Sequence, residues 1–462
     1  MRLVLKNFRI VDEEIDTIGN VIIENGLISE VLPGQHSPDA KTALIIDGEN
    51  FASEGTTCLP VLMPSFVDLH AHFREPGFIE KETLFPSELL ESASLAAAAG
   101  GFGTVICMAN TRPPIDTIEK AAALKSRCDT LGLVDLYPVL SLTKNMEGKE
   151  LSEISAISAD NCSGAYIPLM LSEDGKDLAD DELFIAAMKE AKRIGIPVSC
   201  HCDFGGEEAE AAKSAGQPRS VWSRIEENNA VQRVIDLGKK TSCHVHIAHV
   251  STREAVEKIR REKATANAAG FNLSCEVMPH NLSLTEEDAE KLGGETWGRV
   301  NPPLRSDEDR KALIQALADG TIDAIATDHA PHTNADKAIG VPGFSAFETA
   351  FAAAFTELVR GNGSPPSIGL KQLSSLMSAR PAKLLGFGGN KHCRNSSRSQ
   401  DRKRGRILAG YRADLVIVDT EATWVVDPSL FKTRGKNSPF IGRRLYGKIL
   451  MTLYGGRVVF QC

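Results

Sequence analysis

The stretch Phe66-Val67-Asp68-Leu69-His70-Ala71-His72-Phe73-Arg74 carries the fold prediction, because an apolar run ends there in a group of polar side chains. A nearly continuous apolar run is typical of a parallel strand that is covered on both faces. His70 and His72 are two residues apart, so an extended backbone directs both imidazoles to the same side. Such a pair suits a metal site, although it is more often structural.

Seven similar runs follow this one, separated by amphipathic stretches such as Asp181–Gly195 and Thr252–Lys263. The eight runs are Phe66–His70, Gly103–Ala109, Val134–Ser141, Gly164–Leu171, Pro197–His201, Cys243–His249, Asn272–Pro279 and Thr321–Asp328. Short strands that alternate with helices predict an α/β fold, here a closed (β/α)₈ barrel of the TIM type. A doubly wound open sheet is the competing architecture, but no glycine-rich phosphate-binding motif follows the first run.

The two ends of the chain differ in composition from the middle. Residues 1–60 and 407–462 are rich in β-branched residues and punctuated by glycine, which predicts short strands. We expect them to form one small β-sandwich domain, interrupted by the barrel at 61–387. Residues 388–406, GGNKHCRNSSRSQDRKRGR, are polar and basic, and we interpret them as a solvated loop rather than a nucleic-acid site.

Composition excludes several classes of protein. The 462 residues include 52 Lys and Arg against 61 Asp and Glu, a net charge of −9 that disfavours binding to nucleic acid or anionic membranes. The first residues alternate and soon reach Asp12, unlike a signal peptide, and no apolar run is long enough for a bilayer. The ten cysteines are scattered, and those in apolar runs (Cys107, Cys200, Cys243 and Cys275) are expected to be free thiols. A cytoplasmic location is the simplest prediction.

Three further polar residues end predicted strands. His201 closes the fifth run, His249 the sixth and Asp328 the eighth. In a barrel, the carboxyl ends of the strands converge on one mouth, where active sites lie. Together with His70 and His72, these residues predict a metal site at that mouth. The nearby His244, His246, His280 and His329 weaken the signal, and some of them must have structural roles.

Several longer motifs then identify a resemblance. The segments FVDLHAHFREPG (66–77), GGFGTVICMANTRPP (100–114), NPPLR (301–305), ATDHAPHT (326–333) and VPGFSAFET (341–349) resemble those of the dihydroorotases of the amidohydrolase superfamily. GRILAGYRADLVIVD (405–419) resembles that family's return from barrel to strands. The resemblance covers nearly the whole chain and implies a metal-bearing (β/α)₈ barrel, in agreement with the count of strands.

The resemblance implies a set of ligands for one or two Zn²⁺ ions. The matching positions are His70, His72, His201, His249 and Asp328, the last of which also shuttles a proton. Many relatives carry a bridging carboxylated lysine at the end of strand four, but residues 164–170 contain none. Ser172-Glu173-Asp174-Gly175 instead resembles the branch with a bridging aspartate. Asp174 is the first candidate for that place and Glu173 the alternative.

Substrate-contacting positions also follow from the resemblance. They are His72, Arg74, Asn110, Asn301, His332, Pro342 and Gly343. Arg74 comes two residues after His72 and so points the same way, where its guanidinium can clamp a carboxylate. Dihydroorotate and N-carbamoyl-L-aspartate carry that carboxylate, whereas hydantoin and allantoin do not. For Arg74, the alternative without a function is a surface salt bridge. For Asn301, it is a turn position before proline.

These observations predict a zinc-dependent dihydroorotase. It would reversibly hydrolyse (S)-dihydroorotate to N-carbamoyl-L-aspartate in pyrimidine biosynthesis, with hydroxide supplied by a metal that lowers the pKa of water to about 7. The rivals are an allantoinase or hydantoinase, and a catalytically silent partner of aspartate transcarbamoylase. We expect a homodimer, with contact to aspartate transcarbamoylase as a further possibility. Residues Thr333–Gly343 are well placed to close over the substrate.

Overall fold

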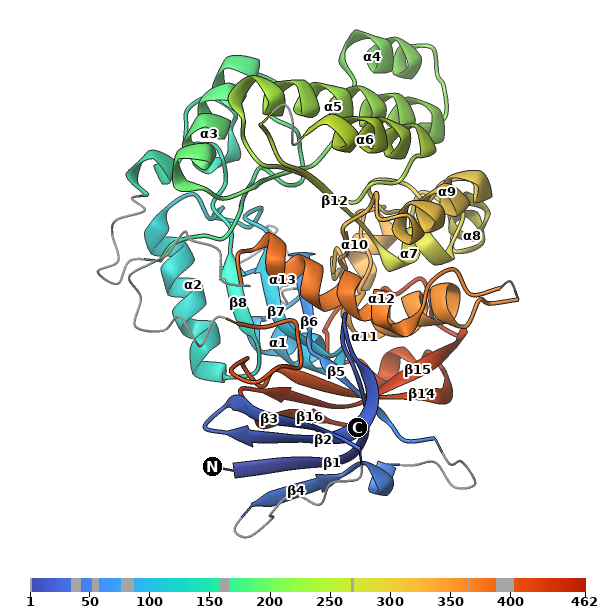
Figure 1. Cartoon of the computed structure of the whole chain (residues 1–462). Coiled ribbons are helices and arrows are strands. Elements are labelled where there is room, and N and C mark those ends of the chain that lie inside the picture. Colours follow the sequence, from blue (N-terminus) through green and yellow to red (C-terminus); the bar gives the residue numbers. More distant parts are fainter. Residues whose placement is uncertain are drawn as a thin grey trace.

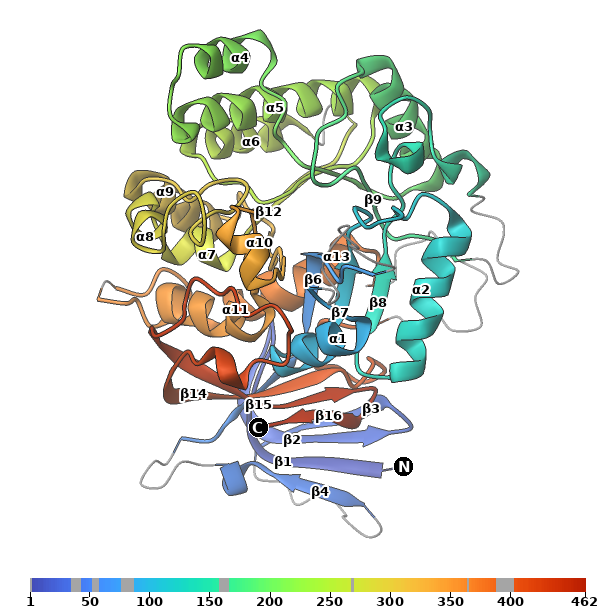
Figure 2. The same ribbon diagram turned by 180° about the vertical axis from the view of Figure 1, so that it is seen from behind.

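The two ends of the chain form a sheet, and the middle of the chain forms a ring of short parallel strands with helices outside it (Figure 1). Figure 2 shows the same arrangement from behind, with α1 and α2 packed beside β6, β7 and β8. The computed structural model describes residues 2–34, 43–51, 58–75, 87–157, 166–266, 270–363, 365–387 and 403–462.

Each of the eight predicted runs overlaps a strand of the ring. The strands are β6 (Phe66–Ala71), β7 (Phe102–Cys107), β8 (Asp135–Pro138), β9 (Leu171–Ser172), β10 (Val198–Cys200), β11 (Val245–Ile247), β12 (Leu273–Val277) and β13 (Ala324–Ile325). β6 to β8 form one parallel arc and β9 to β13 another. Parallel bridges Leu140–Leu171 and Ala71–His329 join the arcs at both seams. The ring therefore closes as the (β/α)₈ prediction requires, and an open sheet does not form.

Amphipathic helices cover the ring. They are α1 (Leu90–Ala99), α2 (Ile118–Leu131), α3 (Asp181–Ile194), α4 (Gly206–Ser214), α5 (Arg219–Thr241), α6 (Arg253–Ala266), α7 (Pro279–Ser283), α8 (Glu286–Lys291), α9 (Asp307–Ala318), α10 (Asn334–Ala338), α11 (Phe347–Ala354), α12 (Leu370–Ser374) and α13 (Arg380–Leu384). The local sequence explains α3: the Asp180 carboxylate accepts from the Glu182 and Leu183 amides, and Gly195 ends the helix in the left-handed region. The two helices named from the sequence, at 181–195 and 252–263, are confirmed.

Strands from the two termini pair directly in the small β domain. They are β1 (Arg2–Val11), β2 (Asp16–Glu24), β3 (Leu27–Pro33), β4 (Leu44–Asp47), β5 (Val61–Pro64), β14 (Leu415–Val425), β15 (Arg444–Tyr454) and β16 (Arg457–Gln461). They form one sheet in the order β16-β15-β14-β5-β1-β2-β3, with β4 beside β1. Leu5, Val21, Leu415 and Leu453 share one apolar core, so residues from both ends stabilise each other. β5 belongs to this sheet, which therefore continues past residue 60.

Strand four is much shorter than the run 164–171 suggests. Only Leu171 and Ser172 form β9, and residues 164 and 165 lie outside the described residues. Pro168 has no amide hydrogen for a sheet ladder, which accounts for the irregular backbone before β9.

Most of the basic segment 388–406 also lies outside the described residues. Arg404 near its end is buried, contrary to the solvated loop that we expected there, because its Nη1 lies 2.8 Å from Asp135 Oδ2.

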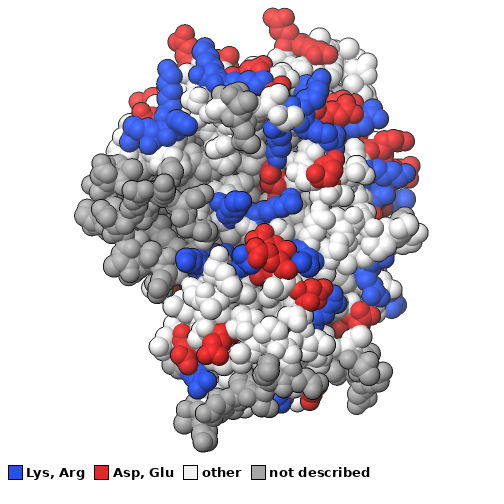
Figure 3. Space-filling model, viewed as in Figure 1, with Lys and Arg blue, Asp and Glu red and all other residues white. Residues whose placement is uncertain are grey.

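Other general predictions can be compared with the described residues. Their cysteines are all free, and Cys107, Cys200, Cys243 and Cys275 are buried. None of the helices in the described part of the chain is both long and apolar enough to cross a membrane. Basic and acidic side chains are interspersed on the face shown in Figure 3.

Candidate active site

The predicted metal ligands gather at the carboxyl ends of the ring strands. His70 lies in β6 and His72 just after it, while the other four follow β9, β10, β11 and β13. All six side chains are buried: His70, His72, Asp174, His201, His249 and Asp328. Their meeting point agrees with the rule that strand ends of a parallel barrel form one mouth.

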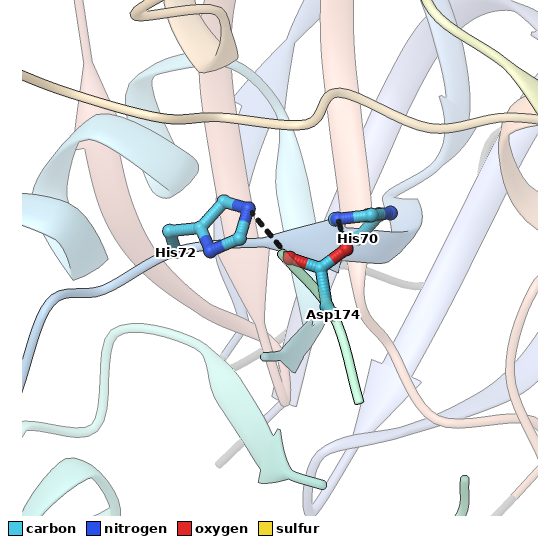
Figure 4. A group of neighbouring side chains, drawn as sticks. All are labelled: His70, His72 and Asp174. Atoms are coloured by element: carbon cyan, nitrogen blue, oxygen red, sulfur yellow. Dashed lines mark ion pairs between the residues drawn. The ribbon is translucent and has the colours of Figure 1, made fainter. Parts of the chain in front are cut away.

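Asp174 lies at the centre of the group. Figure 4 shows its carboxylate between the imidazoles of His70 and His72. Asp174 Oδ1 is 3.3 Å from His70 Nε2, and Oδ2 is 3.6 Å from His72 Nε2. On the other side, Oδ1 is 3.3 Å from His201 Nδ1 and 4.0 Å from His249 Nε2. Two groups of side chains that could hold a metal ion therefore share this one carboxylate: His70, His72 and Asp174, and Asp174, His201 and His249.

Glu173 points elsewhere. Its carboxylate accepts hydrogen bonds from the Leu142 amide at 2.8 Å, from the Thr143 amide at 3.1 Å and from the Thr143 hydroxyl. These bonds anchor the backbone beside Asp174. Neither metal-ligating group of the described residues includes Glu173.

Asp328 completes the group from the last strand. Its Oδ1 is 3.0 Å from His72 Nε2 and 3.7 Å from His70 Nε2. Burial alone would raise the pKa of this carboxyl, but the hydrogen bond to His72 and the charge of His70 outweigh it. The net result holds the Asp328 pKa well below its usual range, so the side chain is a carboxylate at neutral pH.

Hydrogen bonds outside the group orient the first two imidazoles. His70 Nδ1 lies 3.0 Å from Glu276 Oε1, and His72 Nδ1 lies 2.9 Å from Asn110 Oδ1. Because both oxygens accept, each Nδ1 carries the hydrogen and each Nε2 is turned toward the carboxylates. His70 Nε2 is buried and has no hydrogen-bond partner among the described residues. A histidine that binds a metal through one ring nitrogen typically donates the hydrogen of its other nitrogen to an acceptor in this way.

The electrostatics of the group favour a cation. Burial lowers the pKa of His70, but Asp174, Glu276 and Asp328 outweigh it and raise that pKa well above 6.5. His249 differs from His70, because burial and the neighbouring His201 lower the pKa of His249 to about 3. A buried group of carboxylates that stabilises positive charge on a neighbouring imidazole also suits a divalent metal ion.

Acidic residues of the site that the sequence reasoning missed include Glu276 and Asp68. Glu276 in β12 holds His70, and its other oxygen lies 3.1 Å from His246 Nε2. Asp68 in β6 accepts from the Thr327 amide at 2.9 Å and from the Thr327 hydroxyl at 2.5 Å, next to Asp328. Burial raises the pKa of Asp68 to about 7. An ionisable residue inside an otherwise apolar run was the available signal in both cases.

Arg74 begins a second polar group beside the first. Its guanidinium is buried, and its Nη2 lies 3.1 Å from His332 Nε2. The same His332 nitrogen lies 2.9 Å from the Pro342 carbonyl oxygen. Burial and the charge of Arg74 hold the His332 pKa well below 6.5, so the ring is neutral. A neutral nitrogen either accepts from Arg74 or donates to Pro342, which couples the guanidinium to this carbonyl.

The backbone is strained where these side chains emerge. Arg74, His249 and Asp328 have φ angles of 62°, 33° and 45°, in the left-handed region that residues other than glycine seldom adopt. Such positions cluster at functional sites, where the surrounding structure holds them.

The remaining predicted contacts divide into two kinds. Asn110 and Asn301 contact the candidate metal ligands: Asn110 Nδ2 donates to Asp174 Oδ2 at 3.0 Å, and Asn301 Nδ2 lies 3.1 Å from His201 Nε2. Gly343 differs, because its amide donates to the Arg299 carbonyl at 3.1 Å. The structure therefore places Gly343 next to the site without directing its N–H into it.

Known proteins share both the sequence and the fold. A model of the Amidohydrolase family matches residues 61–459. A dihydroorotase of Clostridium botulinum (strain Eklund 17B / Type B) is 36% identical over 100% of both chains, and one of Geobacillus sp. (strain WCH70) is 35% identical over 95% of this chain and 94% of that one. The solved L-hydantoinase (dihydropyrimidinase) of Arthrobacter aurescens superposes with a TM-score of 0.79 at 25% identity, covering 99% of this chain and 96% of that one. The chain therefore belongs to the amidohydrolase family.

Proposed function

We propose that this chain is a dihydroorotase, which interconverts (S)-dihydroorotate and water with N-carbamoyl-L-aspartate in pyrimidine biosynthesis. Full-length relatives that carry this name support the reaction. The observation that carries the substrate assignment is the buried guanidinium of Arg74, which lies beside a group of metal-ligating residues. Both substrates bear a carboxylate, and a buried arginine is the side chain that binds a carboxylate most specifically.

The proposal includes one or two zinc ions. The candidate ligands are His70, His72, Asp174, His201, His249 and Asp328, with Asp174 shared between two sites. The buried Nε2 of His70 faces the Asp174 carboxylate at 3.3 Å without a hydrogen bond among the described residues, and together with the supporting bond from Glu276 it favours a metal there. A bound Zn²⁺ supplies hydroxide at neutral pH and polarises the amide carbonyl.

Asp328 is proposed to move the proton. Its ionised carboxylate can accept a proton from the attacking water, and its neighbour His72 holds Oδ1 in place at 3.0 Å. The same carboxyl can then deliver the proton to the leaving ring nitrogen. In the reverse direction it would accept the proton of the carbamoyl nitrogen as the ring closes.

Recognition of the substrate is proposed to start from Arg74. A carboxylate that binds its guanidinium would compete with His332 for the same Nη2 hydrogens. The Nε2 of His332 would then be free to donate to the Pro342 carbonyl. Asn110 and Asn301 are also proposed to contact the substrate, because each already touches a candidate ligand histidine.

Turnover of a substrate panel tests the reaction. Zinc-loaded protein is incubated with L-dihydroorotate, hydantoin and allantoin, and with N-carbamoyl-L-aspartate for the reverse direction. We expect hydrolysis of dihydroorotate alone among the three rings. Hydrolysis of the uncharged rings alone would replace the substrate by that of a hydantoinase or an allantoinase. Bound metal without turnover of any ring would favour a non-catalytic partner of aspartate transcarbamoylase.

An arginine variant tests the carboxylate contact. Arg74→Gln should lower kcat/KM for dihydroorotate about 100-fold, because a charge-assisted hydrogen bond contributes roughly 1.5–3 kcal/mol. Zinc content should stay unchanged. The matched control is Arg127→Gln, since Arg127 pairs with Glu75 at 2.6 Å but is half-exposed. Loss of zinc with unchanged substrate constants would contradict the assignment of Arg74.

The homodimer and the cytoplasmic location stay predictions. Light scattering of the purified protein tests the first, and cell fractionation tests the second.

A further inference from the structure

A buried lysine holds the segment from Thr333 to Gly343 in place through hydrogen bonds. Thr333 and Asp336 form a capping box at the start of α10, which places Lys337 on the inner face. Lys337 is fully buried, and its Nζ donates to the carbonyls of Arg299 at 2.8 Å, Val341 at 3.0 Å and Gly343 at 3.1 Å. All three hydrogens of the ammonium are therefore used by backbone oxygens.

Among the described residues, no acidic oxygen lies within 4.0 Å of Lys337 Nζ, although the Phe344 ring lies 5.3 Å from it. Burying a cation without a counter-charge is costly, and an apolar side chain would fill the same space without that cost. The ammonium is therefore explained by what its hydrogen bonds hold in place.

Asn437 holds the same loop from the opposite side. It lies far along the chain, between β14 and β15, and is buried. Its Oδ1 accepts from the His332 amide at 2.9 Å and from the Ser345 hydroxyl at 2.9 Å. Its Nδ2 donates to the Gly343 carbonyl at 2.9 Å. One side chain thus connects the backbone of His332 to that of Gly343.

Close contacts leave this loop little freedom. Gly343 has a φ of 134°, and a Cβ there would lie 2.7 Å from Ala330 Cβ and 3.0 Å from His332 Nε2. At Gly435, a Cβ would lie 2.7 Å from the His332 amide nitrogen. The segment after β14 therefore lies directly against His332, and glycine at both positions permits the approach.

We propose that Lys337 and Asn437 are positioning residues, which hold His332 and the Pro342–Gly343 backbone where the substrate ring binds. The inference rests on the proposed function, since it concerns how the residues of that site are held in position. The two residues act through the loop and touch neither substrate nor metal. The loop Thr333–Gly343 is accordingly a fixed part of the site rather than a lid that opens and closes.

Three variants test this proposal: Lys337→Met, Asn437→Asp and the control Lys436→Met. Met removes the donors at position 337 while keeping its length, and Asp removes the Nδ2 donor of Asn437 while keeping Oδ1. Lys436 adjoins Asn437 and donates to the Phe431 carbonyl at 2.6 Å and the Thr433 carbonyl at 2.7 Å, away from His332. The readouts are kcat and KM for L-dihydroorotate, zinc content and Tm.

We expect Lys337→Met and Asn437→Asp to lower kcat/KM about 10- to 100-fold, mainly through KM, with zinc content unchanged. Lys436→Met should stay within about twofold of the unmodified chain. If Lys337→Met does not fold, Lys337→Gln and Asn437→Asp decide by the same criteria. A lower Tm with unchanged kinetics in the two test variants would overturn the proposal and leave the dihydroorotase function standing. An inactive unmodified chain would overturn both.

Discussion

The candidate metal-ligating group and the loop around His332 lie in one proposed site, but they are built differently. The candidate ligands lie at strand ends, and His70 and His72 are also held through Nδ1 by Glu276 and Asn110. The loop owes its position to side chains from elsewhere, above all Lys337 in α10 and Asn437 after β14. The position of the ligand group is set by the topology of the barrel, and that of the loop by packing of the C-terminal segment against it.

This difference separates two kinds of expected defect. Changes at the strand ends should remove metal or the proton-transfer group and so affect kcat. Changes around the loop should leave the metal bound and weaken the fit to the substrate, which affects KM. The small β domain thereby takes part in the site through the connection that holds Asn437, although one of its apolar clusters is separate from the barrel core.

The largest effect is expected at Asp174. Asp174→Asn should lower zinc affinity by more than the 10- to 100-fold that is typical of supporting residues, because both histidine groups share this carboxylate. Zinc content by mass spectrometry and turnover check this. Glu173→Gln is the control from the neighbouring residue and should keep its zinc. Normal zinc in Asp174→Asn together with loss in Glu173→Gln would reverse the two assignments.

The next largest effect is expected from removing Asp328, the proposed proton-transfer group. Asp328→Asn is expected to lower kcat about 10²- to 10⁴-fold in both directions, since the amide cannot carry the proton. Asp323→Asn is the control from the opposite end of β13, where Asp323 accepts from the Cys275 amide at 2.8 Å. Initial rates with dihydroorotate and with N-carbamoyl-L-aspartate measure the effect. Substantial activity of Asp328→Asn in either direction would argue against the shuttle.

Glu276→Gln should have a smaller effect on the same ligand group. The carboxylate of Glu276, whose pKa is held at about 2, supports His70 through Nδ1. Its loss should weaken zinc binding about 10- to 100-fold without removing a ligand. Competition with a chelator measures the affinity. Zinc affinity equal to that of the unmodified chain would place Glu276 in a purely structural role.

The smallest effect is expected at the cap of α10. Thr333→Ala removes the Oγ1 acceptor of the Asp336 amide at 3.1 Å and should cost about 1 kcal/mol of stability. Because Lys337 and Asn437 still hold the loop, kcat/KM should change by about twofold at most. Denaturation and steady-state kinetics are measured together. A kinetic loss as large as that of Lys337→Met would mean that the cap, not the lysine, holds the loop.

Much of the candidate ligand group could be predicted from the sequence. The eight apolar runs each overlap a ring strand, and His70, His72, His201, His249 and Asp328 meet because polar residues at the ends of parallel strands converge. Asp174 and Glu173 could not be separated from spacing alone. Neighbours in a loop differ only in direction, and the amides of Leu142 and Thr143 decide which carboxylate turns away.

The loop around His332 is held by contacts that could not be predicted from the sequence. By itself, the sequence determined the barrel, the positions of the ligand histidines and the arginine beside them, because local periodicity dictates which residues end each strand. The tertiary structure alone decided that Glu276 supports His70, that Lys337 is buried among carbonyls and that Asn437 reaches His332. These are contacts between residues far apart in the chain, and no local pattern records them, because they depend on which surfaces pack together after the ring has closed.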